Sequence, residues 1–259
     1  MKVSGRVAIV TGGGRGIGKA ITLALAREGA DVAINYRRDE EAAKETIAEV
    51  EKMGRKGIAV KCDVTDWERT QEMVTDVAES FGKIDILISS AGIVSKGAFS
   101  GDTEVEELHR VFDTHVFGTF HFVKACLPHL RKNPRSDIHV LSSMSPHIAP
   151  PGHMPYAVAK AAEEKMAEIL AKEERRHNVR VNTIACGVVQ TEMGLRLVRF
   201  NQGGELDDLA VNFPFGRICQ PEDVANLSLF LLSEEGSYMS GHVIFLDGSN
   251  PYGVAKEHY

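Results

Sequence analysis

Two side chains with complementary chemistry stand four residues apart in the second half of the chain, Tyr156 and Lys160. Residues with this spacing share one face of a helix, so a helix here would bring the phenol beside the ammonium group. A neighbouring cation stabilises the phenolate and lowers the pKa of a tyrosine from about 10 toward neutral pH. Such a tyrosine can act as a general acid or base on an alcohol or a ketone. By itself, however, a Tyr-x-x-x-Lys pair is more often structural than catalytic.

A glycine-rich segment, Thr11 to Gly18, follows an apolar run and precedes an amphipathic stretch. Glycines let a backbone turn tightly and approach a diphosphate, and the first N–H groups of the following helix attract an anion. The spacing Gly-x-x-x-Gly-x-Gly differs from the Gly-x-Gly-x-x-Gly of the commonest dinucleotide fold. Its position between a predicted strand and a predicted helix nevertheless indicates a dinucleotide-binding loop. We expect a dinucleotide site that includes Gly12, Gly14, Arg15, Gly16, Ile17 and Gly18.

The end of the second apolar run indicates which dinucleotide is bound. Dinucleotide folds usually place a carboxylate there for the adenosine ribose hydroxyls. This chain has Tyr36, Arg37 and Arg38 instead, and Arg15 lies in the glycine loop. Guanidinium groups attract a 2′-phosphate, so the pattern favours NADP(H) over NAD(H). Two acids follow at residues 39–40, and they either cap the next helix or bind the ribose.

The elements that must position these groups alternate between short apolar runs and amphipathic stretches. Runs that are apolar throughout are typical of strands covered on both faces, and strand–helix alternation predicts right-handed βαβ units. We therefore expect a single α/β domain over residues 1–259, a Rossmann-type doubly wound parallel sheet of seven strands with helices on both faces. The predicted strands are Arg6–Val10, Asp31–Asn35, Gly57–Lys61, Ile84–Ser89, Ile138–Ser142, Arg180–Ala185 and Val243–Leu246, and the predicted helices are Ile17–Glu28, Glu40–Met53, Trp67–Phe81, Glu104–Leu130 and Pro155–His177.

Composition narrows the class of protein. The 259 residues are 43% hydrophobic with a net charge of -6, which argues against nucleic acid as a partner. No apolar run approaches the roughly 18 residues of a membrane span, and the N-terminus lacks the pattern of a signal peptide. The four cysteines are far apart and form no Cys-x-x-Cys, so we expect reduced thiols, no metal site and a cytoplasmic location.

Taken together, these motifs resemble the short-chain dehydrogenase/reductase family over essentially the whole chain. The chain is most similar to the 3-oxoacyl-thioester (acyl-carrier-protein) reductase branch and its alcohol dehydrogenase relatives. The resemblance rests on Thr11–Gly18, Cys62-Asp63-Val64, Ser89-Ser90-Ala91-Gly92, Ser143 thirteen residues before Tyr156, Arg180-Val181-Asn182, Gly187–Thr191 and Gly241–Gly248.

The resemblance implies a role for each matching residue. Tyr156 would exchange the alcohol proton, Lys160 would lower its pKa and bind the nicotinamide ribose, and Ser143 would bond the substrate oxygen, with Ser142 as the alternative. The remaining cofactor contacts would be Asp63 and Val64 at the adenine, Ser90, Ala91 and Gly92 at the ribose, and Gly187, Val189 and Thr191 at the nicotinamide. The activity implied is an NADP(H)-dependent interconversion of a ketone and a secondary alcohol, with NAD(H)-dependent alcohol oxidation as an alternative. The family relationship also implies a homotetramer or a homodimer.

His115 departs from the family pattern, which usually has asparagine at this position. There the backbone of the asparagine holds a water in a proton relay to the lysine. His115 could retain that relay through its carbonyl, could shuttle protons itself, or could be a satisfied buried histidine. Ser89 and Cys186 depart as well, so a cofactor-binding protein with weak or no catalysis, acting as a redox sensor, is a second hypothesis. A sugar-nucleotide epimerase is a third, but the segment after Gly187 leaves little room for a nucleotide-sugar domain.

The substrate should bind beyond the carboxyl ends of the strands, beneath a lid formed by residues 192–220. The predicted pocket is apolar with two histidines, which suits an uncharged small carbonyl or alcohol compound. Its members are Ser145, His147, His153, Met154, Met193 and Leu197.

A thioester-linked substrate on an acidic carrier protein would need a basic dock. Arg131, Lys132, Arg135, Arg175 and Arg176 are the candidates, although cations near helix ends often complement the helix dipole instead. The predicted helix Pro155–His177 is expected to have a solvated face of charged residues. These residues are Glu163, Glu164, Lys165 and Glu168.

Overall fold

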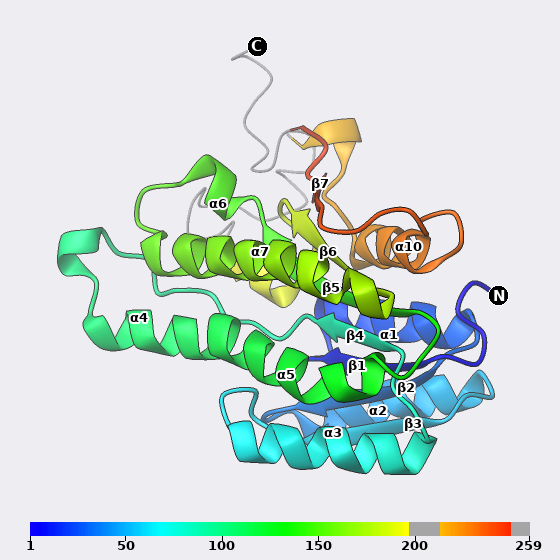
Figure 1. Ribbon diagram of the computed structural model, residues 1–259. Helices are drawn as coiled ribbons and strands as arrows, with labels where there is room; N and C mark the ends of the chain where they lie inside the picture. The colour runs from blue at the N-terminus through cyan, green and yellow to red at the C-terminus, as the bar shows by residue number, and fades with distance from the viewer. Residues whose placement is uncertain (197–212, 250–259) are drawn as a thin grey trace.

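The computed structural model describes residues 1–196 and 213–249. Seven strands form one sheet in the order β3-β2-β1-β4-β5-β6-β7, and every pairing is parallel. The predicted fold class is therefore confirmed (Figure 1). The strands are β1 (Val7–Thr11), β2 (Asp31–Tyr36), β3 (Gly57–Lys61), β4 (Ile86–Ser89), β5 (Ser136–Ser143), β6 (Val179–Cys186) and β7 (Val243–Leu246).

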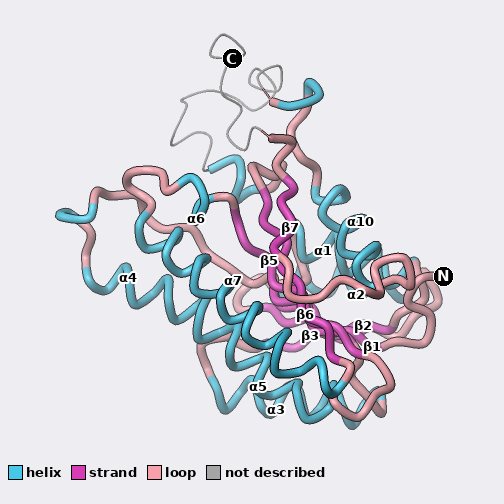
Figure 2. Tube along the Cα trace, turned by 45° about the horizontal axis from the view of Figure 1, so that its top comes forward, coloured by secondary structure: helices cyan, strands magenta, loops and turns pink. Residues whose placement is uncertain are grey.

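Helices cover both faces of the sheet, as the apolar strands predicted (Figures 1 and 2). One face packs against α1 (Gly16–Arg27), α2 (Glu40–Lys52) and α10 (Pro221–Leu232). The other face packs against α3 (Trp67–Phe81), α5 (Gly118–Leu130) and α7 (Met154–Glu174). Successive strand residues serve opposite faces, so Ala8 and Val10 belong to the first core and Ile9 to the second. No helix in residues 1–196 or 213–249 has the length and apolar character needed to cross a bilayer.

The prediction of one continuous helix over Glu104–Leu130 is wrong in one respect. A π-helical segment, η2 (Asp113–Phe117), separates α4 (Val105–Phe112) from α5. Wider turns of this kind often occur at functional sites, and this one carries His115.

Several short elements were not predicted. They are α6 (Ser145–Ile148) and the 3-10 turns η1 (Ser100–Asp102), η3 (Arg175–His177) and η5 (Pro214–Gly216). Helix α10 was missed as well, although Pro221 at its first position and the capping box between Gln220 and Asp223 mark its start.

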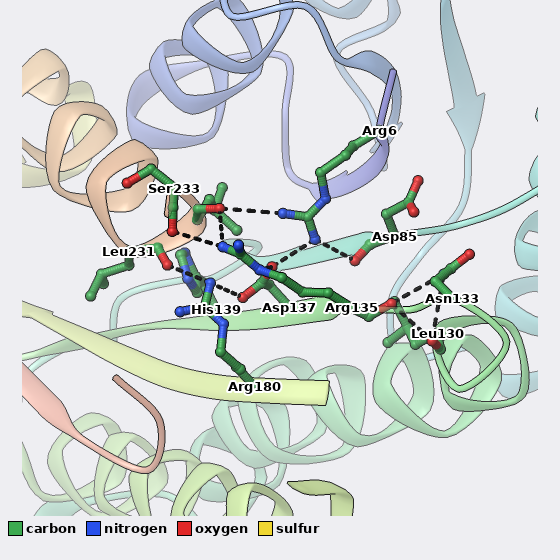
Figure 3. Close-up of polar contacts among 12 residues, drawn as sticks. Arg6, Asp85, Leu130, Asn133, Arg135, Asp137, His139, Arg180, Leu231 and Ser233 are labelled. Atoms are coloured by element: carbon green, nitrogen blue, oxygen red, sulfur yellow. Dashed lines mark hydrogen bonds and ion pairs between the residues drawn. The ribbon is translucent and has the colours of Figure 1, made fainter. Parts of the chain in front are cut away.

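One buried carboxylate organises the amino-terminal edge of the sheet (Figure 3). Asp137 is 1% exposed; its oxygens lie 2.6 Å from Nη2 of Arg6 and 2.5 Å from Nη2 of Arg180. Arg135 Nε lies 3.7 Å from the same carboxylate. The guanidinium groups of Arg135 and Arg180 also donate to carbonyl oxygens at the end of α10, where cations complement the helix dipole. The cluster therefore fastens α10 to the central strands.

Replacing Asp137 with asparagine should remove the charge that compensates three guanidinium groups while keeping the side-chain shape. We expect the free energy of unfolding to fall by about 3–5 kcal/mol, as for other broken buried ion pairs. Urea unfolding followed by circular dichroism measures the loss. The matched control is Glu72→Gln at the exposed pair with Arg69, which should cost no more than about 1 kcal/mol. Equal losses in the two variants would contradict the assignment.

Candidate active site

Apart from Tyr156 and Lys160 on α7, the residues predicted to bind a dinucleotide lie at or just after the carboxyl ends of strands. Strands β1 and β4 are neighbours, and the strand order reverses between them, which is where ligands bind in open parallel sheets. The structure brings the predicted segments to this edge: residues 12–18 after β1, 36–38 after β2, 63–64 after β3, 90–92 after β4 and 187–191 after β6.

The glycine loop lies too close to its neighbours for side chains. A Cβ atom on Gly13 would stand 2.3 Å from Cγ2 of Ile34, and one on Gly18 would stand 2.3 Å from the carbonyl oxygen of Gly12. Gly12 and Gly16 have φ angles of +66° and +53°, a conformation that favours glycine. The glycines thus allow the loop to pack tightly where it enters α1, whose first N–H groups attract an anion, and we call this loop the glycine cradle. The spacing argument missed Gly13.

Two buried polar residues hold this cradle in place. The Thr11 hydroxyl accepts hydrogen bonds from the N–H groups of residues 90 and 91, each at 2.9 Å. Asn35 Oδ1 accepts from the N–H of Gly12 at 2.8 Å, and its Nδ2 donates to the carbonyl of Cys62, the first residue after β3. Neither residue was among the predicted cofactor contacts. The sequence feature that could have identified them is a polar side chain at the end of an otherwise apolar strand.

The arginines at the end of β2 are exposed. Arg37 Nη1 lies 3.8 Å from the Asp63 carboxylate, and Arg38 has no ion pair within the described residues. Arg15 lies 3.7 Å from Glu192. These guanidinium groups are largely solvated, and they belong to two of the segments that converge at this edge of the sheet.

The two acids after them cap the next helix. Asp39 Oδ1 accepts from the N–H of Ala42 at 3.2 Å, as an N-cap residue does. Glu40 pairs with Lys44 at 2.7 Å in the first turn of α2. The structure agrees with the capping interpretation of residues 39–40.

Helix α7 carries Tyr156 and Lys160 in its first two turns, and Ser143 ends the neighbouring strand β5. Lys160 Nζ donates to the carbonyl of Leu141 at 2.6 Å and lies 5.9 Å from the centre of the Tyr156 ring. Ser143 Oγ accepts from the N–H of Ser145 at 3.1 Å. The serine, tyrosine and lysine predicted from spacing therefore lie together.

Opposing effects act on the pKa of Tyr156. Burial raises it, whereas the Lys160 ammonium and the Ser143 hydroxyl lower it. Burial has the larger effect, so the pKa stands above its ordinary value. The sequence analysis considered the cation alone.

A buried carboxylate lies one turn beyond Lys160. Glu163 is 1% exposed, and its Oε2 lies 2.8 Å from Lys160 Nζ. The prediction that Glu163 belongs to a solvated face is wrong. Residues 156, 160 and 163 share one face of α7, and that face points into the core.

Glu164 is also buried, which contradicts the same prediction. Its Oε1 accepts from Ser142 Oγ at 2.5 Å, and its Oε2 lies 3.0 Å from Nε2 of His147. Because successive strand residues alternate, Ser142 faces away from Ser143 and toward Glu164. Lys165 and Glu168 do lie on the exposed side of α7, where they pair with each other.

His115 fills the space between the β4 loop and the tyrosine. Its ring packs edge-on against Tyr156 at 5.3 Å, and Nε2 lies 2.8 Å from the carbonyl oxygen of Ile93 and 3.2 Å from its amide nitrogen. A Cβ on Gly92 would stand 2.7 Å from Cε1 of the ring. The side chain is 1% exposed, so of the earlier alternatives the structure agrees with a buried histidine, but only its Nε2 is hydrogen-bonded within the described residues.

The predicted pocket residues are only partly gathered. Ser145 and His153 are buried beside the site, and Met154 begins α7. His147 instead packs on Phe245 of β7, with ring centres 4.7 Å apart, and lines a cavity of about 330 Å³ between α7 and β7 that Tyr156 and Ser143 do not line. Met193 is 38% exposed, and Leu197 lies outside the described residues.

The described part of the chain holds neither a metal-binding cluster nor a disulfide. Among residues 1–196 and 213–249, no three histidine, cysteine, aspartate or glutamate side chains gather as a metal ion requires. Cys62, Cys126, Cys186 and Cys219 are free thiols.

Comparison with known proteins adds a relationship to this geometry. Residues 12–249 match the family described as enoyl-(acyl carrier protein) reductase. Glucose 1-dehydrogenase 2 of Bacillus subtilis is 33% identical over 247 residues, which are 95% of each chain. A short chain dehydrogenase from Burkholderia cenocepacia in complex with NADP has a TM-score of 0.87 and 30% identity, covering 96% of this chain and 98% of that one. Carveol dehydrogenase from Mycobacterium avium in complex with NAD has a TM-score of 0.90 and 26% identity, covering 95% and 98%.

The match extends over the sheet, the glycine cradle and the helix that carries the tyrosine and the lysine. Relatives of this similarity are named as dehydrogenases and reductases. The chain accordingly belongs to the short-chain dehydrogenase/reductase family and is an oxidoreductase of alcohols and ketones.

Proposed function

We propose that this protein uses NADP(H) to interconvert a small, mostly apolar ketone and its secondary alcohol. The observation that carries the proposal is the meeting of Ser143, Tyr156 and Lys160 at the sheet edge that also holds the glycine cradle. A cradle with no room for Cβ atoms fits a diphosphate, and the nearby guanidinium groups fit a further phosphate.

When bound, the nicotinamide would supply or accept the hydride. The chain's residues would hold it and manage one proton. Ser143 would donate to the substrate oxygen, Tyr156 would give its proton to that oxygen in reduction or take it in oxidation, and Lys160 would hold positive charge near the phenol. The residues that would hold the cofactor are Gly12, Gly14, Arg15, Gly16, Ile17, Gly18, Tyr36, Arg37, Arg38, Asp63, Val64, Ser90, Ala91, Gly92, Tyr156, Lys160, Gly187, Val189 and Thr191.

NADP(H) is favoured because the end of β2 presents Arg37 and Arg38 and no free carboxylate. Asp39, the acid nearest that strand end, is engaged as the cap of α2. NAD(H) is the alternative, since similar structures hold either cofactor.

The carrier-linked thioester alternative has less support. Arg131 pairs with Glu174 at 2.6 Å, and Arg135 belongs to the cluster at the amino-terminal edge of the sheet. Both residues precede β5, at the edge opposite the tyrosine and the serine, so they provide no dock beside the site.

Residues 192–220 are proposed as the substrate lid, and 197–212 of this segment lie outside the described residues. Val189 pairs with Cys219 in a short parallel bridge, so the segment leaves and returns beside the predicted nicotinamide residues. We also propose a cytoplasmic location, where the free thiols would remain reduced.

Replacing Tyr156 with phenylalanine should lower turnover by at least about 100-fold, because the reacting proton loses its carrier. Reduced-nicotinamide absorbance with a panel of ketones and secondary alcohols measures turnover. Fluorescence titration should show a much smaller change in cofactor affinity, because the other residues that would hold the cofactor are unaltered. Full activity in this variant would refute the mechanism. Absence of turnover by the unmodified protein on the whole panel would favour the redox-sensor hypothesis.

Replacing Arg37 with aspartate should weaken NADPH binding by about tenfold or more and leave NADH binding nearly unchanged, since only NADPH carries the 2′-phosphate. Fluorescence titration of both cofactors provides the comparison. Lys52→Asp makes the same change of charge at the exposed far end of α2 and is the matched control. Tighter binding of NADH than NADPH by the unmodified protein would refute the cofactor assignment.

We further propose a homotetramer or homodimer formed through the outer face of η2, α5 and α7, where Phe117, Phe120, Val158 and Ile169 are each between 44% and 51% exposed. Exposed apolar groups on neighbouring helices are typical of an interface. Sedimentation equilibrium should give a multiple of 28.3 kDa, and Phe120→Lys should shift the population toward monomer. A monomeric unmodified protein would refute this assembly.

A further inference from the structure

Lys160 has a buried counterion whose place in the proposed reaction is unassigned. Glu163 Oε2 lies 2.8 Å from Lys160 Nζ, and the two residues are 1% and 5% exposed. The other carboxylate oxygen accepts from the Thr119 hydroxyl on α5 at 2.7 Å, and that hydroxyl lies 2.9 Å from Ser89 Oγ on β4. The carboxylate is thus oriented by three elements of the fold.

A charge in a dry interior persists only beside an opposite charge, because desolvation otherwise favours the neutral form. Burial alone would lower the pKa of Lys160, but Glu163 and Tyr156 outweigh it and the pKa stands above its ordinary value. Burial alone would raise the pKa of Glu163, but Lys160 and His115 outweigh it and hold the pKa below its ordinary value. Each member of the pair therefore keeps the other charged.

The same carboxylate also faces His115. Glu163 Oε2 lies 3.6 Å from Nδ1 of that ring, whose Nε2 contacts the backbone of Ile93 and whose Cε1 packs on Gly92. His115 is therefore the link between the Lys160–Glu163 pair and the loop after β4. That loop contains predicted ribose contacts.

We propose that Glu163 is a positioning residue of the reaction, which keeps Lys160 protonated in the core and ties it through His115 to the loop after β4. The inference rests on the proposed function in its use of Lys160. The groups that face the ion pair are Tyr156 on α7, His115 on η2, Thr119 on α5, Ser89 on β4 and the Cys186 thiol on β6, whose pKa burial raises.

The direct test measures the protonation of Lys160 without any substrate. The full chain is labelled at the lysine carbon next to the amine, and the signal is followed by NMR through a pH titration and assigned by its loss in Lys160→Arg. Glu163→Gln should lower the titration midpoint of Lys160 by at least about one pH unit, the effect of removing an opposite charge at this range. An unchanged midpoint would overturn the proposal.

Glu168→Gln is the matched control. It removes one carboxylate from the same helix, but Glu168 pairs with Lys165 and Lys172 on the exposed side. In this variant the titration midpoint of Lys160 should equal that of the unmodified protein. If the midpoint falls as far as in Glu163→Gln, the effect is general to the helix and the proposal is overturned.

Glu163→Asp covers the case in which the glutamine variant does not fold. Aspartate keeps the negative charge but, being one methylene shorter, holds it farther from Lys160. The titration midpoint of Lys160 should therefore fall by less than in Glu163→Gln. An unchanged midpoint would overturn the proposal here too.

A kinetic arm separates this proposal from the proposed function. The pH above which turnover falls should be lower in Glu163→Gln, by the same amount as the titration midpoint of Lys160. If the NMR midpoint shifts while the pH dependence of turnover does not, the positioning role is overturned. If the unmodified protein turns over no ketone or alcohol but the Lys160 midpoint still falls in Glu163→Gln, the proposed function is refuted. The conclusion that Glu163 keeps Lys160 protonated is then still supported.

Discussion

The parallel pairing of β1 with β2 on one side and β4 on the other is the constraint on which the site depends. It gathers chain segments that are remote in sequence at one edge of the sheet. Hydrogen bonds at the ends of β1 and β2, from residues 90–91 to Thr11 and from Gly12 to Asn35, then hold the loops in contact. Only with that support can the backbone of Gly13 approach its neighbours so closely that a side chain has no room.

The two edges of the sheet use buried charge differently. At the amino-terminal edge, Asp137 and three arginines are surrounded by helix-end carbonyls, and the cluster fastens α10 to the sheet. At the carboxyl-terminal edge, Glu163 Oε2 pairs with Lys160 Nζ at 2.8 Å and lies 3.6 Å from His115 Nδ1, which has no hydrogen bond within the described residues. There the buried pair places a positive charge beside the tyrosine, and its two members compensate each other in the interior.

The interrupted helix shows how a local distortion serves the site. Segment η2 turns more widely than the helices on either side, and His115 on it lies between Tyr156 and Gly92. The apolar periodicity of residues 104–130 predicts a helix but contains no sign of a wider turn. The turn is stabilised by contacts with Ile93 and Glu163, which come from other elements.

Periodicity and short spacing are local properties, so the sequence alone predicts the order of the seven strands, the longer helices before β6, the glycine cradle and the shared face of Tyr156 and Lys160. The burial of Glu163 and Glu164 and the role of Asp137 at the sheet edge depend instead on contacts between distant segments. A charged residue on a helix is usually solvated, and nothing local marks the exceptions. Glu163 is buried because Thr119 and His115 are brought to it from 44 and 48 residues away, and a buried charge is stable only where the fold supplies such partners.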